Sequence, residues 1–257
     1  MRGHLWKKAR IMRVAEILSR MGLRLLIGVL LFGAACENME QSRTPPGPQD
    51  MSTPSQCPSD MVEIESFCID RYESAIKEHS PFHVPTGGEP VNGFEQMPQG
   101  YISGTVAASV CESGEKRLCS SEEWLRACQG PEETLYPYGN TYQASACNDS
   151  RSAHPIHTFF GDDPDRWLPE AMNDPGINQQ TDTVDLSGQN AECVSADGVY
   201  DLHGNLHEWV SDSDGIFRGG FYADARINGE GCMYRTTAHG FGYHDYSTGF
   251  RCCANLP

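Results

Sequence analysis

The chain has 257 residues, of which 35 are acidic and 19 basic, so its formal net charge is −16. A chain of this length can bury one core of about 200 residues and carry additional segments. The negative charge argues against a basic face for binding nucleic acid or anionic lipid headgroups. The same carboxylates suit hard cations such as calcium, although most of them are expected to form a solvated surface.

The first 35 residues have the pattern of an export signal. They contain seven basic residues against one acid, and an apolar run of 11 residues from Leu25 to Ala35 ends at Cys36. A basic start, a short apolar stretch and small residues before a cut are typical of a secretory signal. A run of this length is too short to span the roughly 30 Å hydrocarbon core of a bilayer. We therefore expect residues 1–35 to be a signal peptide.

The segment Gly33–Cys36 resembles the lipobox of bacterial lipoproteins, in which the cysteine is lipidated and becomes the first mature residue. Gly33 departs from the pattern, because an aliphatic residue is usual there. The resemblance implies an exported protein, in the periplasm or at the cell surface, that Cys36 anchors to the membrane. Secretion without a lipid is the alternative. Removal of the leader would leave 12 basic and 34 acidic residues.

The rest of the chain divides into a tether and one folded domain. Residues 36–56 are rich in Pro, Ser and Gln, which predicts a disordered tether. The domain at 57–257 begins with two expected strands, at 61–65 and 67–72, and a proline-rich loop follows at 79–101.

Two short helices are expected next, near 105–112 and 121–129. Ser120 and Glu123 have the spacing of a capping box before the second helix, and Gly130 ends it. Residues 129–200 show no long helix. Short strands are expected at 205–210, 217–222 and 248–253. The composition predicts a loop-rich α+β domain.

Ten cysteines follow Cys36, and an even number in an exported chain indicates a disulfide framework. Their number alone does not give the pairing.

Six blocks occur in an order that is characteristic of one family. They are Phe67–Glu73, Lys116–Trp124, Tyr136–Asn140, Gly198–Trp209, Arg218–Gly220 and Gly249–Cys252. In this order they resemble the formylglycine-generating enzyme, or sulfatase-modifying factor, family. The resemblance covers nearly all of residues 57–257. It implies the family's loop-rich, disulfide-stapled variant of the C-type-lectin fold.

The resemblance implies two disulfides, and it does not give the pairing of the other six cysteines after Cys36. The implied pairs are Cys111–Cys252 and Cys128–Cys232. The further pairs that we expect are Cys57–Cys68, Cys147–Cys193 and Cys119–Cys253.

The resemblance also implies calcium. The matching ligands are the side chains of Asp201 and Glu208 and the carbonyls of Gly204 and Leu206. Calcium prefers six to eight hard oxygens, which carboxylates and a tight glycine turn can supply. The alternative is an ordinary turn in which Asp201 caps its own backbone.

A second family calcium site would use Asn148 and the carbonyl of Asp149. A downstream acid would complete it, and Asp174 is the candidate.

The sequence departs from the family at its catalytic centre. Family enzymes bind copper(I) through two thiolates about five residues apart, just after the Arg-Gly-Gly segment. Asp224 stands at the first of these positions, and no cysteine stands at the second. A hard carboxylate does not replace a soft thiolate toward copper(I). We therefore expect no copper centre.

Several histidines and arginines have a structural interpretation. The pairs His203 with His207 and His154 with His157 are expected to be exposed loop residues rather than metal ligands. Arg235 and Arg251 are expected to pair with buried acids. The aromatic residues Trp124, Trp209, Phe250 and Tyr200 are expected in the core.

The leading functional hypothesis is a non-catalytic, calcium-stabilised binding or assembly module held at a membrane by a lipid. Its partner would be an envelope protein, a peptide or a glycan. The alternative is a formylglycine-generating oxidase, or a divergent enzyme of the family, that acts on a protein or peptide substrate. A retained scaffold without the thiolate pair favours the first hypothesis and leaves catalysis open.

Overall fold

The computed structural model describes residues 55–256. The expected leader, Cys36 and all but the last two residues of the expected tether lie outside this range. Within it, no helix combines the length and the apolar character needed to cross a membrane.

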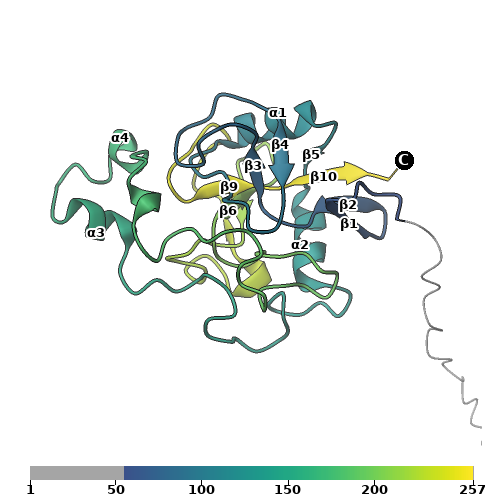
Figure 1. Cartoon of the computed structure of the whole chain (residues 1–257). Helices are drawn as coiled ribbons and strands as arrows, with labels where there is room; N and C mark the ends of the chain where they lie inside the picture. The colour runs from purple at the N-terminus through teal and green to yellow at the C-terminus, as the bar shows by residue number, and fades with distance from the viewer. Residues whose placement is uncertain (1–54, 257) are drawn as a thin grey trace, which may run out of the picture. The chain divides into compact units, whose positions relative to one another are not determined.

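The first sheet joins the two ends of the domain. Its four strands, in the order β1-β2-β10-β5, are antiparallel at each contact. Their bounds are β1 Met61–Ile64, β2 Phe67–Asp70, β10 Cys252–Asn255 and β5 Arg117–Leu118. Because β10 pairs with β2, the last strand lies beside the opening hairpin, as Figure 1 shows.

The two expected helices form, and polar caps start both of them. In α1, Gly104–Ser113, the Ser103 side chain accepts a hydrogen bond from the Val106 amide. In α2, Ser121–Gln129, Ser120 and Glu123 complete the expected capping box, so two of the amides left open at a helix start are satisfied. Each helix buries one face, which in α2 carries Trp124, Ala127 and Cys128.

The second sheet positions the functional region. Its order is β8-β7-β6-β9, and β6 runs parallel to β9. The bounds are β6 His207–Trp209, β7 Phe217–Arg218, β8 Arg235–Thr236 and β9 Thr248–Phe250. A separate antiparallel pair joins β3 Ser74–Ile76 to β4 Pro90–Asn92. The segment at 79–101, expected to be only a loop, therefore contains one short strand.

Residues 129–200 form mainly loops, as expected, and the loop continues to Leu206. The helical turns in this part of the chain are α3 Pro155–Phe160, α4 Pro169–Met172 and η1 Ile177–Gln179, and a further turn, η2, spans Gly231–Met233. In Figure 1, α3 and α4 lie together at one side of the domain, away from the two larger helices.

Five disulfides connect these short elements, and they are the five pairs named above. Cys111 of α1 bonds Cys252 of β10 across 141 residues, and Cys128 of α2 bonds Cys232 of η2 across 104. Closing the larger loop restricts the unfolded chain by about 5 kcal/mol in the chain-entropy model. The disulfides and the buried aromatic core thus stabilise a domain whose strands have four residues or fewer.

Candidate functional site

The loop after β7 places Asp224 in a closed turn. Phe221 and Asp224 exchange backbone hydrogen bonds of 2.8 and 3.0 Å. The Oδ1 atom of Asp224 accepts from the amides of Arg226 and Ile227 at 2.9 and 3.0 Å, and Oδ2 accepts from the Tyr234 hydroxyl at 3.1 Å. Both oxygens of this half-buried carboxylate are therefore used within its own loop.

The second position of the family's metal pair does not suit a side chain. Gly229 stands five residues after Asp224 and has a φ of +132°. A Cβ atom added there would lie 2.7 Å from the carbonyl oxygen of Met233. Cys232 lies nearby but bonds Cys128. All ten cysteines of the described range are in disulfides, so these residues do not fit copper(I).

A chain of polar side chains runs inward from Asp224. The Tyr234 hydroxyl lies 3.3 Å from Nε2 of His207, whose Nδ1 lies 3.1 Å from the Ser247 hydroxyl. Ser247 in turn donates to Asp245 at 2.7 Å. Tyr234, His207, Ser247 and Asp245 are all buried. Polar groups in such surroundings are costly unless they bond one another, and each of these does.

Burial sets the charge of this chain. Burial, with a smaller contribution from the neighbouring His239, lowers the pKa of His207 to about 3. It also raises the pKa of Tyr234 to about 12, with Asp224 adding to the rise. Both side chains are therefore neutral near pH 7. His203 and His207 are buried rather than exposed as expected, because β6 and the turn before it enter the core.

The second buried group consists of three carboxylates and one guanidinium. Arg251 Nε donates to Glu208 Oε2 and its Nη2 donates to Oε1, both at 2.6 Å, and the Trp124 indole donates to Oε2 at 2.7 Å. Glu73 and Asp201 lie near this pair and have no salt-bridge partner among residues 55–256. Three buried carboxyl groups therefore share one guanidinium here.

Electrostatics within this group shift the carboxyl pKa values. Burial, followed by the charges of Asp201 and Glu208, raises the pKa of Glu73 well above its usual value. Burial also raises the pKa of Asp201 to about 7, against the hydrogen bond that Asp201 accepts from the Gly188 amide. A cation at this place would favour the charged forms of both groups.

The turn at 201–206 has the tight geometry expected of it. Asp201, Gly204 and Asn205 have φ values of 60°, 83° and 55°. The Leu206 amide donates to Glu73 at 3.1 Å, and the Asn205 side chain donates to the same carboxylate. The turn thus directs amide hydrogens at Glu73, a residue that the calcium pattern did not include.

The expected first calcium site is only partly available. Asp201 lies at the carboxylate group, but both oxygens of Glu208 are already bound by Arg251. Across the described range, no three side chains of His, Cys, Asp or Glu converge in a way that could hold a metal ion. The donor atoms are of the type that calcium prefers, whereas Glu208 serves as the partner of Arg251.

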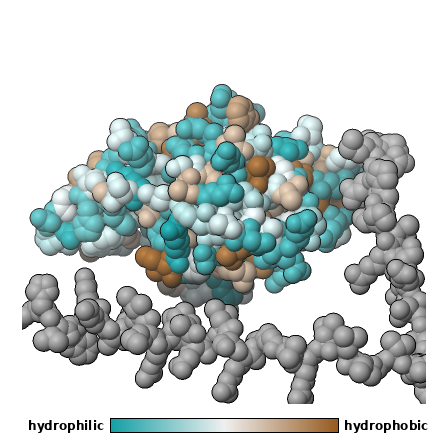
Figure 2. Space-filling view, turned by 90° about the horizontal axis from the view of Figure 1, so that it is seen from below, coloured by the Kyte–Doolittle hydropathy of each residue, from teal (hydrophilic) through white to brown (hydrophobic). Residues whose placement is uncertain are grey.

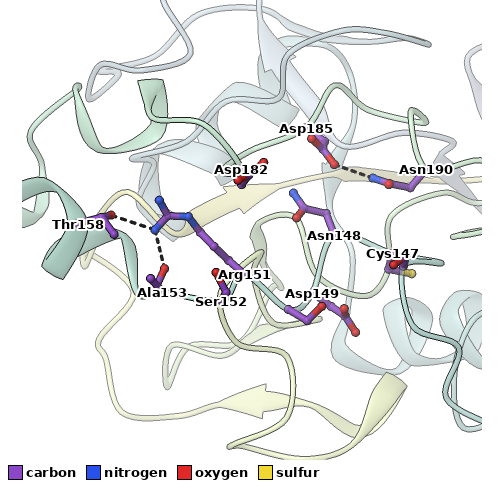
Figure 3. Close-up of a pocket in the computed structure, with 12 residues that line it drawn as sticks. Cys147, Asn148, Asp149, Arg151, Ser152, Ala153, Thr158, Asp182, Asp185 and Asn190 are labelled. Atoms are coloured by element: carbon purple, nitrogen blue, oxygen red, sulfur yellow. Dashed lines mark hydrogen bonds between the residues drawn. The ribbon is translucent and has the colours of Figure 1, made fainter.

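The second expected site lies at an open pocket of about 450 Å³. Asn148 and Asp149 line it, together with Asp182, Asp185 and Asn190 (Figure 3). The two downstream acids come from the loop after η1. The close-up shows Asn148 between these acids and Asp149.

Asp174, the expected downstream acid, does not line this pocket. Its carboxylate accepts from the Gly176 amide at 2.8 Å. Asp149 also has a role that the sequence did not indicate, because its Oδ2 lies 3.1 Å from Nε2 of the buried His203.

The remaining expectations have mixed outcomes. Arg251 pairs with a buried acid as expected, whereas Arg235 is exposed and has no acidic partner within the described residues. Trp124, Trp209 and Phe250 are in the core, and Tyr200 is only half-buried. Tyr234 and Ser247 were missed, because neither has a motif that indicates its neighbours.

Comparisons with known proteins agree with the sequence blocks. A family model described as "Sulfatase-modifying factor enzyme 1-like domain" matches residues 31–256, a range that begins inside the expected leader. No curated protein sequence matches the chain significantly.

Similar solved structures include PvdO from Pseudomonas aeruginosa, with a TM-score of 0.48, 17% identity, and coverage of 74% of this chain and 80% of PvdO. Another is the Major Tropism Determinant U1 variant, with a TM-score of 0.46, 13% identity, and coverage of 77% of this chain and 53% of that one.

Proposed function

Because the chain belongs to the sulfatase-modifying factor family, we propose that its domain is a non-catalytic binding or assembly module of an exported lipoprotein. The domain has the α+β, C-type-lectin-like fold of that family, with five disulfides. One observation carries the proposal. Where the family binds copper(I), Asp224 is hydrogen-bonded within its own turn, and every cysteine of residues 55–256 is bridged.

The same loop offers a surface for a partner. Ile227 is 83% exposed and Met233 is 50% exposed, and both lie within ten residues after Asp224. Figure 2 shows a mainly hydrophilic face on which apolar residues form separate patches. These exposed apolar side chains in the loop that carries Asp224 support contact with a partner.

Export and anchoring are part of the proposal. Five disulfides favour an oxidising compartment. The lipobox-like segment supplies the anchor at Cys36. Membrane partitioning of the wild-type chain and of Cys36→Ala tests this part, because loss of the lipid would release the variant from membranes. Equal partitioning of both would reject the anchor.

Bound calcium that stabilises the domain is the other part of the proposal. The raised pKa values of Glu73 and Asp201, which a cation would lower, and the oxygen-rich pocket at Asn148 support a bound divalent cation. Asp201 would be a direct ligand, while Glu208 would remain with Arg251.

A second candidate is a divergent enzyme of the same family. The buried polar chain from Asp224 through Tyr234 and His207 favours it, because such a chain can pass a proton between a surface carboxylate and the core. This chemistry would not need thiolates.

Photo-crosslinking distinguishes the two. A photoreactive residue at Ile227 would form a discrete adduct with an envelope component, and the same residue at the exposed Lys77, in a different segment, is the matched control. The binding module predicts an adduct from position 227 that survives Tyr234→Phe. Lack of any adduct, together with turnover of a peptide that Tyr234→Phe abolishes, would favour the enzyme.

A further inference from the structure

Arg218 is a buried cation that lacks an acidic partner. Its side chain lies on β7 and is 6% exposed. Its Nε atom donates to the Ser121 hydroxyl at 2.8 Å, whereas Nη1 is buried and has no hydrogen-bond partner. No carboxylate of residues 55–256 lies within salt-bridge distance of it. A buried charge of this kind normally pairs with an opposite charge.

The surroundings of Arg218 disfavour its charged form further. Burial lowers its pKa, and the adjacent Arg235, its partner across β7 and β8, lowers it further. Glu122 opposes these effects but makes no ion pair. The guanidinium carbon lies 5.8 Å from the ring centre of Trp124, and this contact fixes one of its faces.

The start of α2 lies against the same guanidinium. Helix α2 has nine residues, and Ser121 is the first of them. The Ser120 side chain satisfies the Glu123 amide, and the amides of Ser121 and Glu122 find no acceptor among the described residues. A helix start combines free amides with a positive partial charge, which favours an anion.

Acidic side chains do not fill this position. Glu123 is held by Arg117 at 2.7 and 2.6 Å and by the Ser120 amide. Glu122 is exposed. The positive end of α2 and the buried, unpartnered Nη1 atom of Arg218 therefore lack an anion among the described residues.

We propose that Arg218, Ser121 and the first amides of α2 form a binding site for a small oxyanion, with Arg235 at its rim. The ligand would be either a free tetrahedral ion such as sulfate or a carboxylate of a partner protein. The inference is independent of whether the domain is catalytic. It assigns a second recognition point at the ends of β7 and β8, which flank the Asp224 loop.

The test uses the purified full chain and two probes, sodium sulfate and sodium acetate, each compared with sodium chloride at equal ionic strength. The readouts are the melting temperature and the NMR signal of the Arg218 side-chain Nε–H group. Sulfate is expected to shift this signal in a saturable way and to raise the melting temperature. Acetate acting at lower concentration than sulfate would identify a carboxylate as the ligand, and the reverse order a free ion.

Variants locate the effect. Arg218→Met is expected to lower the affinity for the probe by about tenfold or more, and Ser121→Ala by about fivefold, because each removes hydrogen bonds to the anion. Lys77→Met removes the same charge far from α2 in the sequence and should leave the affinity unchanged. Arg218→Lys keeps the positive charge but loses the planar set of guanidinium N–H donors. It replaces Arg218→Met in the test if Arg218→Met does not fold.

If neither probe shifts the Arg218 signal, or if Arg218→Lys and wild type respond equally, the proposal is wrong. A loss of probe affinity in Lys77→Met as large as that in Arg218→Met, both measured from the melting temperature, would also reject it, since it would indicate a general effect of charge.

Discussion

Arg251 binds both carboxylate oxygens of Glu208, with two N–O distances of 2.6 Å and both side chains fully buried. The pair joins β6 to the residue between β9 and β10, so it links the functional loop to the last segment of the chain. Charges buried in this way stabilise a fold only while each retains its partner.

Removing one member of this pair should therefore be costly. We expect Arg251→Met to lower the free energy of unfolding by about 3–5 kcal/mol, because Glu208 would be left charged and unpaired in the core. Chemical denaturation measures the change. The control is Arg117→Met, which breaks a partly exposed pair with Glu123 and should cost about 1 kcal/mol. Equal losses in the two variants would contradict the account.

Calcium should stabilise the domain through Asp201. Chelation is expected to lower the melting temperature of the wild type and to lower that of Asp201→Asn by less, because the variant has lost a ligand charge while the pocket at Asn148 is intact. Asp182→Asn tests the pocket at Asn148 in the same way. A wild-type melting curve that chelation does not move would reject calcium at both places.

The buried His207 should make the domain sensitive to acid. Its pKa in the fold is about 3 and its ordinary value is about 6.5, so the unfolded chain takes up a proton before the folded one. The stability that this residue gives is complete above pH 6.5 and is lost as the pH falls toward 3. The expected slope is at most about 1.4 kcal/mol per pH unit.

Comparison of two histidine variants measures this effect. His207→Gln should flatten the curve of melting temperature against pH between 6.5 and 4, and His157→Gln, at an exposed position, should not. Parallel curves for wild type and His207→Gln would show that another group causes the acid sensitivity.

Gly204 should not tolerate a side chain. A Cβ atom there would lie 2.1 Å from the Asn148 carbonyl oxygen, and the φ of +83° adds strain. Gly204→Ala is expected to lower stability by about 2 kcal/mol or more, in line with strain at a special backbone position. Gly242→Ala, where an added Cβ meets nothing within 4 Å, is the control and should change little. The prediction is wrong if Gly204→Ala is as stable as the wild type, or if Gly242→Ala loses as much stability as Gly204→Ala.

Local patterns predicted the parts of the fold that depend on neighbours in sequence. The spacing of Ser120 and Glu123 gave the start of α2, and the glycine turn at Gly204 was visible in the motif. The two-residue strand β5 was missed because its partner, β10, lies at the other end of the domain's sequence, and β8 was missed because a long loop separates it from β7. Strands of this length have no periodicity of their own.

The sequence predicted which residue types occupy the functional region, but not which side chains contact one another there. The replacement of a thiolate by Asp224 could be seen in the sequence, whereas its partner Tyr234 could not. The burial of His207 follows from the position of β6 between β7 and β9, which no local pattern shows. The ion pair of Arg251 with Glu208 joins residues 43 positions apart in the sequence. Because it occupies the Glu208 carboxylate, this side chain is not free to bind calcium as the motif implied.

A thiol count on the unfolded, unreduced chain tests the central claim most directly. In the full chain carrying Cys36→Ser, the account predicts no titratable thiol, and it predicts no stoichiometric binding of copper(I) to the native protein. Two titratable thiols, together with one equivalent of tightly bound copper(I), would contradict it and restore the oxidase.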